Sequence, residues 1–122
     1  MKKILNIICA LFLFGCNQAD VKLSGNYKMI NAPENAEITL SFEENNFSGL
    51  AAVNRYFGTF EQNKNIVKFN VAGLTMMMGP ENMMQAEQDY IKFLSSVNSF
   101  VFENGLLILK TVNDNELKFE KI

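Results

Sequence analysis

The feature that most constrains the fold is a change of hydrophobic period part-way along the chain. In the first half, apolar side chains alternate with polar ones, as in Ile38-Thr39-Leu40-Ser41-Phe42, and short polar turns separate such segments. A period of two indicates strands with one buried face. Between about residues 80 and 97 the apolar positions follow a helical stripe instead. Strand-like segments then return, so the pattern predicts one late helix within an otherwise β chain.

The expected strands cover residues 25–30, 38–42, 47–53, 56–61, 67–71, 100–102, 106–111 and 116–120, with the helix over residues 80–97. Asn104-Gly105 between two apolar runs is a strong hairpin signal. We therefore expect an α+β fold, a mostly antiparallel, curled or barrel-like sheet of about seven to eight strands with the helix across it. Nothing in the composition marks an internal linker.

The N-terminus is typical of a secretory signal: Lys2 and Lys3 precede an apolar run from residue 4 to 14, which ends at Gly15-Cys16. Such a run would span only about 16 Å as a helix, too short for a bilayer. Leu13-Phe14-Gly15-Cys16 resembles the lipobox of bacterial lipoproteins, although Phe14 is larger than usual there. The resemblance implies a signal peptide over residues 1–15, a lipid on Cys16 and a short tether over 16–22, before a domain over 23–122.

This protein is therefore expected to be exported and held to a membrane through lipid on Cys16. Asn17 follows the cysteine where an aspartate would favour the inner membrane, which favours the outer membrane and the periplasm. The alternative is an ordinary cleaved signal peptide that happens to end near a cysteine.

The chain lacks the residues that several classes of active site require. The chain has no His, and its second cysteine, Cys9, lies within the signal, so Ser-His and Cys-His systems are absent and zinc is disfavoured. Glu43 and Glu44, beside two asparagines, fit a solvated turn better than an acid–base pair. Losing Lys2 and Lys3 changes the formal charge from −2 to −4, which argues against nucleic acid. We expect no enzyme, no cofactor and no small-molecule substrate.

Several segments in order resemble the META-domain (HslJ-like) family. Asn54-Arg55-Tyr56-Phe57-Gly58-Thr59-Phe60 is similar to its G-C-N-x-[YF]-x-G-x-[YF] segment, and Thr75-Met76-Met77-Met78-Gly79-Pro80 to its T-x-M-A-C-P stretch. Met83-Met84-Gln85-Ala86-Glu87 and Asn104-Gly105-Leu106-Leu107-Ile108-Leu109 resemble its helix start and a late hairpin. The family-motif residues are Asn54, Tyr56, Gly58, Thr75, Met77, Pro80, Glu87 and Gly105.

The resemblance implies an envelope or secreted protein, with some members linked to heat shock or antibiotic tolerance and no established catalytic role. Two departures from the family stand at Val53 and Gly79, where relatives commonly have cysteines. If that pair forms a disulfide in relatives, this chain has replaced it as a whole.

Two motif segments allow alternative roles. Arg55 and Tyr56 could form an exposed recognition pair; the structural interpretation, which we favour, has Asn54 bonding a turn backbone, Tyr56 or Phe57 in the core and Gly58 supplying an unusual backbone angle. Glu87, among apolar helix neighbours, is expected to bond nearby backbone.

The crowding of methionines is the remaining oddity. Five of them lie within nine residues: Met76, Met77, Met78, Met83 and Met84. They could be flexible core fillers, soft ligands for Cu(I), or an adaptable surface for apolar peptides. Taken together, the sequence predicts a non-enzymatic envelope lipoprotein, a stress-related binding or structural module contacting an envelope protein, with Cu(I) handling as the alternative.

Overall fold

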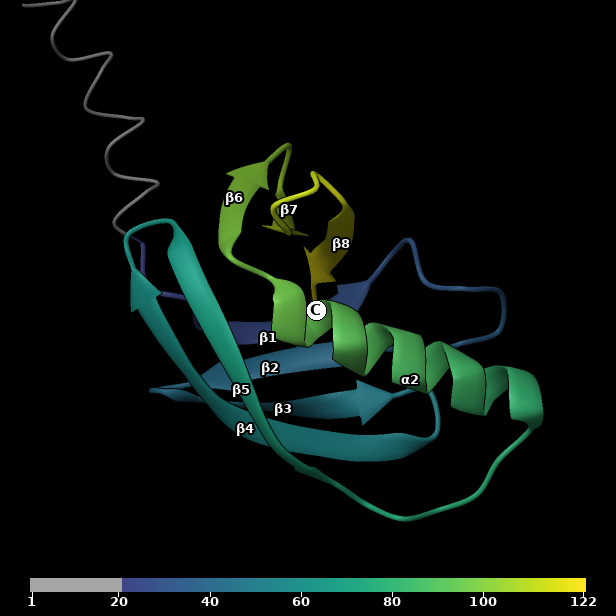
Figure 1. Ribbon diagram of the computed structural model, residues 1–122. Helices are drawn as coiled ribbons and strands as arrows, with labels where there is room; N and C mark the ends of the chain where they lie inside the picture. Colours follow the sequence, from purple (N-terminus) through teal and green to yellow (C-terminus); the bar gives the residue numbers. More distant parts are fainter. Residues whose placement is uncertain (1–20) are drawn as a thin grey trace, which may run out of the picture.

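A computed structural model describes residues 21–122, and in it eight antiparallel strands close into a barrel accompanied by one helix (Figure 1). The strands are β1 (Gly25–Met29), β2 (Thr39–Glu43), β3 (Asn46–Ala51), β4 (Asn54–Asn63), β5 (Ile66–Leu74), β6 (Ser99–Glu103), β7 (Leu106–Lys110) and β8 (Glu116–Lys121), and the helix is α2 (Glu81–Ser96). This confirms the expected class, the eight strands and the single late helix. The predicted signal peptide, residues 1–15, and residues 16–20 of the predicted tether over 16–22 lie outside the described residues.

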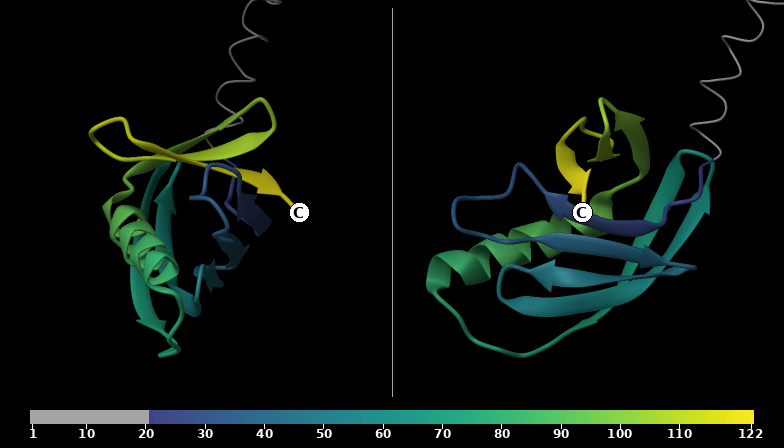
Figure 2. Two further views of the ribbon diagram at one scale, coloured as in Figure 1. Left: turned by 90° about the vertical axis from the view of Figure 1, so that its right-hand side faces the viewer. Right: turned by 180° about the vertical axis from the view of Figure 1, so that it is seen from behind.

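The order of strands around the barrel follows the order along the chain. The barrel closes where β1 pairs with β8, with Tyr27 opposite Lys121 and Met29 opposite Phe119. Its thinnest seam lies between β5 and β6, where the single pair is Ile66 with Ser99. Helix α2 connects these two strands and packs against β5 and β3 (Figure 1). The left view of Figure 2 shows β6 to β8 lying across one end of the sheet formed by the first five strands.

The predicted alternation sets which side chains enter the barrel. Along β4, buried and exposed residues alternate from Asn54 to Glu61. Aromatic rings fill the interior of the first five strands, where Phe42 meets Phe60 edge-on at 5.2 Å between ring centroids, and Phe47 meets Phe69 at 5.2 Å. Edge-on pairs add to the stabilisation that burial itself provides. The helix closes this core with Tyr90 and Leu94 on the apolar stripe expected from the sequence.

The hairpin predicted at Asn104-Gly105 is present in the structure. Asn104 and Gly105 join β6 to β7 with φ of 54° and 81°. Positive φ at both central residues is the requirement of a type I′ hairpin, which explains why Gly105 occupies the second position. The family-motif glycine at residue 105 therefore has a backbone role, as predicted.

The described chain begins at the end of the barrel that carries the β4–β5 turn. The Gln62 amide donates to the Val21 carbonyl at 2.6 Å and accepts from the Leu23 amide at 2.9 Å. Leu23 itself is fully buried. The loop between β5 and α2, residues 75–80, lies at the opposite end of the molecule (Figure 1). Within residues 21–122, no helix is long and apolar enough to cross a membrane.

Candidate functional site: a buried polar junction beneath an exposed methionine loop

Most of the family-motif residues meet at a junction between β4, α2 and the 75–80 loop. Glu87 on α2 is 5% exposed, and its Oε1 accepts hydrogen bonds from the backbone amides of Asn54 at 2.6 Å and Val53 at 3.2 Å. Its Oε2 accepts from Asn54 Nδ2 at 2.8 Å. Three N–H donors offset the cost of burying this carboxylate. The prediction that Glu87 bonds nearby backbone is confirmed.

The other side of the Asn54 amide holds the 75–80 loop. Asn54 Oδ1 accepts from the Met77 amide at 2.6 Å and from the Thr75 hydroxyl at 2.9 Å, and Nδ2 also donates to the Met77 carbonyl at 3.1 Å. Thr75 Oγ1 in turn accepts from the Arg55 amide at 3.1 Å. One asparagine thus joins strand, helix and loop, and both polar atoms of its side chain are hydrogen-bonded. The expected bond from Asn54 to loop backbone is confirmed.

A pair of tyrosines extends the junction into the core. The Tyr56 hydroxyl donates to the Thr39 carbonyl at 2.6 Å and also contacts the Tyr90 hydroxyl. Because a hydroxyl has one proton to give, Tyr90 is the donor between the two. Burial raises the pKa of both phenols above the ordinary value of 10.0, so both are neutral near pH 7. The pair therefore fastens the helix to the barrel and offers no base.

In this segment the favoured placement of Tyr56 in the core is confirmed, the alternative of an exposed Arg55–Tyr56 pair is excluded, and the expectation for Gly58 is wrong. Tyr56 is 1% exposed whereas Arg55 is exposed, so they do not form an exposed recognition pair. The alternation along β4 turns neighbouring side chains to opposite faces. Gly58 does not have the unusual backbone angle expected of it. It is needed for space, because a Cβ there would lie 2.0 Å from the Asn70 carbonyl oxygen, next to the β-bulge between β4 and β5.

The methionines divide into two groups. Met76, Met77 and Met78 expose 93%, 61% and 85% of their surface, while Met83 and Met84 on α2 are half-buried. The interpretation as core fillers is therefore wrong for the first three, because the loop carries them outside the barrel. Pro80 ends this loop as the N-cap residue of α2, and its carbonyl accepts from the Met83 and Met84 amides.

Other candidate residues are not brought together. Glu43 and Glu44 lie exposed at the β2–β3 turn, and Asp114 lies in the β7–β8 turn. Among residues 21–122, no three His, Cys, Asp or Glu side chains are grouped as a metal site. Cys16 lies outside the described residues. Sequence reasoning missed Tyr90 and Thr39 as hydrogen-bonding partners, and the only signal was the place of Tyr90 on the buried helix stripe.

Val53 and Gly79, the two positions that depart from the family pattern described above, are neighbours here. A Cβ built on Gly79 would lie 3.6 Å from the Val53 Cβ and 2.9 Å from its Cγ2. Cβ atoms joined by a disulfide are about 3.5–4.5 Å apart. The Val53 side chain fills the space beside Gly79, so the larger residue at one position matches the absent side chain at the other.

Residues 15–122 match the META domain family. The chain belongs to this family. Family membership supports an envelope-associated bacterial protein and assigns no molecular activity. No curated protein matches the chain.

Two solved structures resemble this META domain. One is an NMR structure of a protein from Burkholderia xenovorans, with a TM-score of 0.73, 18% sequence identity and 87% of each chain covered. The other is a crystal structure of a DUF4847 family protein from Bacteroides vulgatus, with a TM-score of 0.57, 15% identity, and 68% of this chain and 57% of that chain covered. At these identities the likeness shows the fold alone.

Proposed function

We propose that this protein is a lipoprotein anchored through lipid on Cys16 to the outer membrane, facing the periplasm, and that it acts without catalysis by contacting another envelope protein. The observation that carries the proposal is the methionine loop, defined as Met76 to Met78. Three consecutive apolar side chains in solvent are a feature of contact surfaces. Thioether side chains adapt to partners of varied shape, and the link to stress that the family resemblance implies suits such a role.

The fixed backbone beneath the loop supports this role. Asn54 holds both the amide and the carbonyl of Met77, so the loop is ordered before any partner arrives. A surface that is already ordered loses less entropy on binding than a flexible one. The donors to the buried carboxylate of Glu87 all come from Val53 and Asn54, which gives it a structural part in supporting the loop.

The two ends of the domain suit an anchored protein. Gln62 holds the chain at Val21, and the tether from Cys16 to Val21 reaches at most about 18 Å when extended. A lipid on Cys16 would therefore keep the β4–β5 end near the membrane. The methionine loop, at the opposite end, would then face proteins in the periplasm.

The experiment combines labelling with site-specific crosslinking in living cells. Palmitate label is expected on the wild-type chain and not on Cys16→Ser. A photo-reactive amino acid at Met78 should crosslink a discrete protein that is not crosslinked from Lys68, an exposed position on β5. The crosslink should weaken in Cys16→Ser, where the anchor is missing. Label that persists in Cys16→Ser, equal crosslinking from both positions, or a robust hydrolase or transferase activity of the Cys16→Ser form would contradict the proposal.

Cu(I) handling is the second candidate, because the three exposed thioethers are soft ligands accessible to an ion. Titration with Cu(I) against a competing chelator tests it. The Met76→Leu/Met77→Leu/Met78→Leu variant should lose affinity, whereas the half-buried control pair Met83→Leu/Met84→Leu should lose less. Equal affinity in the triple variant and the wild type rejects copper binding at the loop and leaves the protein-contact proposal standing.

A further inference from the structure

The outer face of the barrel carries a straight row of side chains across four strands. Strand register puts Asn26 opposite Ser41, Ser41 opposite Ser48, and Ser48 opposite Phe57. Directly opposite residues in a sheet have Cβ atoms about 5 Å apart. A second outward row runs beside the first, through Glu43, Asn46, Thr59 and Asn70. We call the Asn26–Ser41–Ser48–Phe57 set the outer row.

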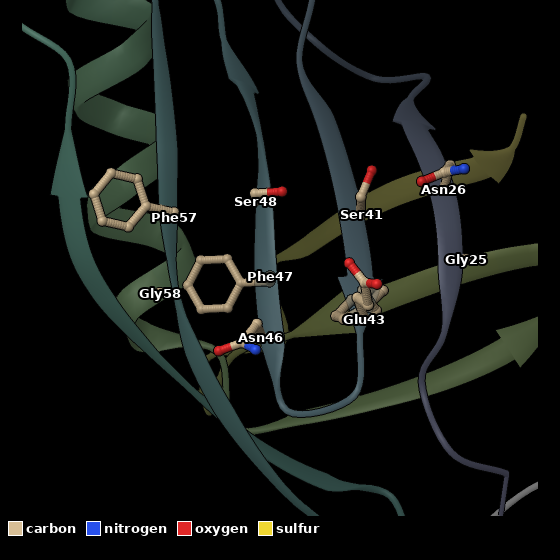
Figure 3. A pocket seen from close by; sticks show the side chains of 10 residues that line it. Gly25, Asn26, Ser41, Glu43, Asn46, Phe47, Ser48, Phe57 and Gly58 are labelled. Atoms are coloured by element: carbon tan, nitrogen blue, oxygen red, sulfur yellow. The ribbon is translucent and has the colours of Figure 1, made fainter.

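The outer row borders a hollow of about 440 Å³, to which β1, β2, β3 and β4 all contribute (Figure 3). Phe57 stands at one side of it, 50% exposed, although its strand neighbours Tyr56 and Gly58 are buried. A Cβ on Gly73 would lie 2.9 Å from the tip of the Phe57 ring, so the glycine makes room for the ring against β5. The ring is thus held at the edge of the hollow while half of its surface stays in solvent.

The polar members of the row have hydrogen-bonding capacity to spare. Amide and hydroxyl side chains both donate and accept. In the part of the chain that the structure describes, none of the side-chain hydrogen bonds involves Asn26, Ser41 or Ser48. Glu43 is the only charged side chain lining the hollow. The hollow therefore suits a ligand that is uncharged, rich in donors and acceptors, and able to cover an aromatic ring.

These properties are those of a sugar chain. A pyranose ring offers hydroxyls around its edge and a C–H face that packs on an aromatic ring, and pockets that fix such ligands combine apolar walls with a few polar groups. An anionic ligand would meet Glu43 and no lining Lys or Arg. An extended peptide cannot join the sheet here, because β1 to β4 are each paired on both sides. We propose that the outer row binds an uncharged oligosaccharide.

The dimensions set the size of the ligand. Four neighbouring strands span three gaps of about 4.8 Å, so the outer row is about 14 Å long, enough for a few linked sugar rings. The row runs across the strands, and the sugar chain would lie in the same direction. One ring would cover Phe57, and the next ones would meet Ser48, Ser41 and Asn26 in turn.

Because the chain contains no Trp, the fluorescence of a tryptophan introduced at the hollow would measure ligand binding there. Phe57→Trp in the full chain, solubilised in a detergent without sugar headgroups, places the chain's single indole at the hollow, where it can be excited apart from the three tyrosines. Chitotetraose, cellotetraose and maltotetraose are the neutral probes, and tetragalacturonate is the charged one. At least one neutral tetrasaccharide should give a saturable change in emission, and adding Ser48→Lys should weaken its binding by about tenfold. Val112→Trp, 75% exposed elsewhere on the molecule, is the matched control and should not respond.

Calorimetry on the wild-type chain and Phe57→Ala supplies a second measurement that does not rely on the reporter. The tetrasaccharide that binds should lose about tenfold or more in affinity to Phe57→Ala. No response to any neutral tetrasaccharide overturns the proposal. An equal response of Val112→Trp also overturns it, as does a response to tetragalacturonate alone. A response to an extended peptide and to none of the sugars would overturn it too. None of these outcomes depends on the anchor or on the methionine loop, so the proposal stands or falls separately from the proposed function.

Discussion

The two sides of the 75–80 loop differ in their contacts: the inner side is hydrogen-bonded to the domain, and the outer side is exposed to solvent. On the inner side, the backbone of Met77 is held by Asn54, which is itself held by the buried Glu87. On the outer side, Met76 and Met78 expose most of their surface. The inner side is held by a buried hydrogen-bond network, whereas the outer side is exposed apolar surface that adds little to the stability of the fold.

Within this short segment, we assign the hydrogen-bonded inner side to the stability of the domain and the exposed outer side to function. Hydrogen bonds in a buried network stabilise strongly because leaving any partner unpaired is costly. Exposed apolar side chains stabilise little, so their presence calls for another explanation, which here is contact with a partner. Substitutions that break hydrogen bonds on the inner side should therefore destabilise the domain, and substitutions on the outer side should not.

The largest effect is expected for Asn54→Ala. It removes the amide that serves Glu87, Thr75 and Met77, and leaves the carboxylate of Glu87 with two backbone donors. The free energy of unfolding should fall by about 3–5 kcal/mol, as for other broken buried polar networks. Urea denaturation measures the loss, and Asn70→Ala on the exposed side of β5 is the matched control. A fall no larger than that of the control would show that the junction does not hold the loop.

A crosslink across the same junction should have the opposite sign. Val53→Cys/Gly79→Cys puts two cysteines at a Cβ separation near 3.6 Å, and the disulfide should form in air without reshaping the backbone. Closing this loop should add about 2–4 kcal/mol to the free energy of unfolding. The measurement compares the oxidised variant with the same variant under reductant. If mass spectrometry finds two unpaired thiols after oxidation, the residues do not lie as described.

The sequence was enough for the elements but not for their contacts. Apolar segments bounded by turn residues, some of them alternating, predicted all eight strands, and Asn104-Gly105 predicted its hairpin, because these are local properties of the chain. Closure of β1 on β8, the thin seam between β5 and β6, and the helix beside it depend on long-range register, which alternation does not encode. β4 begins at Asn54, ahead of the predicted residue 56, because its first residues pair with the end of β3.

The same limit applies to the candidate site. Glu87 could be assigned a backbone partner from burial alone, since an unpaired carboxylate is too costly inside an apolar helix face. The exposure of Met76 to Met78 could not be predicted, because methionine is common both in cores and on contact surfaces. The outer row is visible only once β1 to β4 are in register, since its four residues lie far apart in the chain.

A pH titration tests whether the tyrosine pair belongs to the inner side of the comparison. Burial raises the pKa of Tyr56 and Tyr90 above 10.0, so the unfolded chain loses these protons first. Their contribution to stability is complete below pH 10 and is lost as the pH rises above it, by about 1.4 kcal/mol per pH unit for each phenol. Tyr90→Phe should lower that slope by about 1.4 kcal/mol per pH unit, while Tyr27→Phe, at a less buried phenol, should lower it less. Equal slopes in all three proteins would mean that lysine deprotonation dominates.

The smallest effect is expected on the outer side of the loop. Met76→Ser/Met77→Ser/Met78→Ser should change the free energy of unfolding by no more than about 0.5 kcal/mol, because these side chains are already exposed to water in the folded protein. Met83→Ser/Met84→Ser, from the half-buried pair on α2, should cost about 1–2 kcal/mol by urea denaturation. The triple variant should at the same time lose the crosslink from residue 78. A triple variant that unfolds as easily as the helix pair would mean that the loop methionines serve the fold, and the reason for inferring a partner there would disappear.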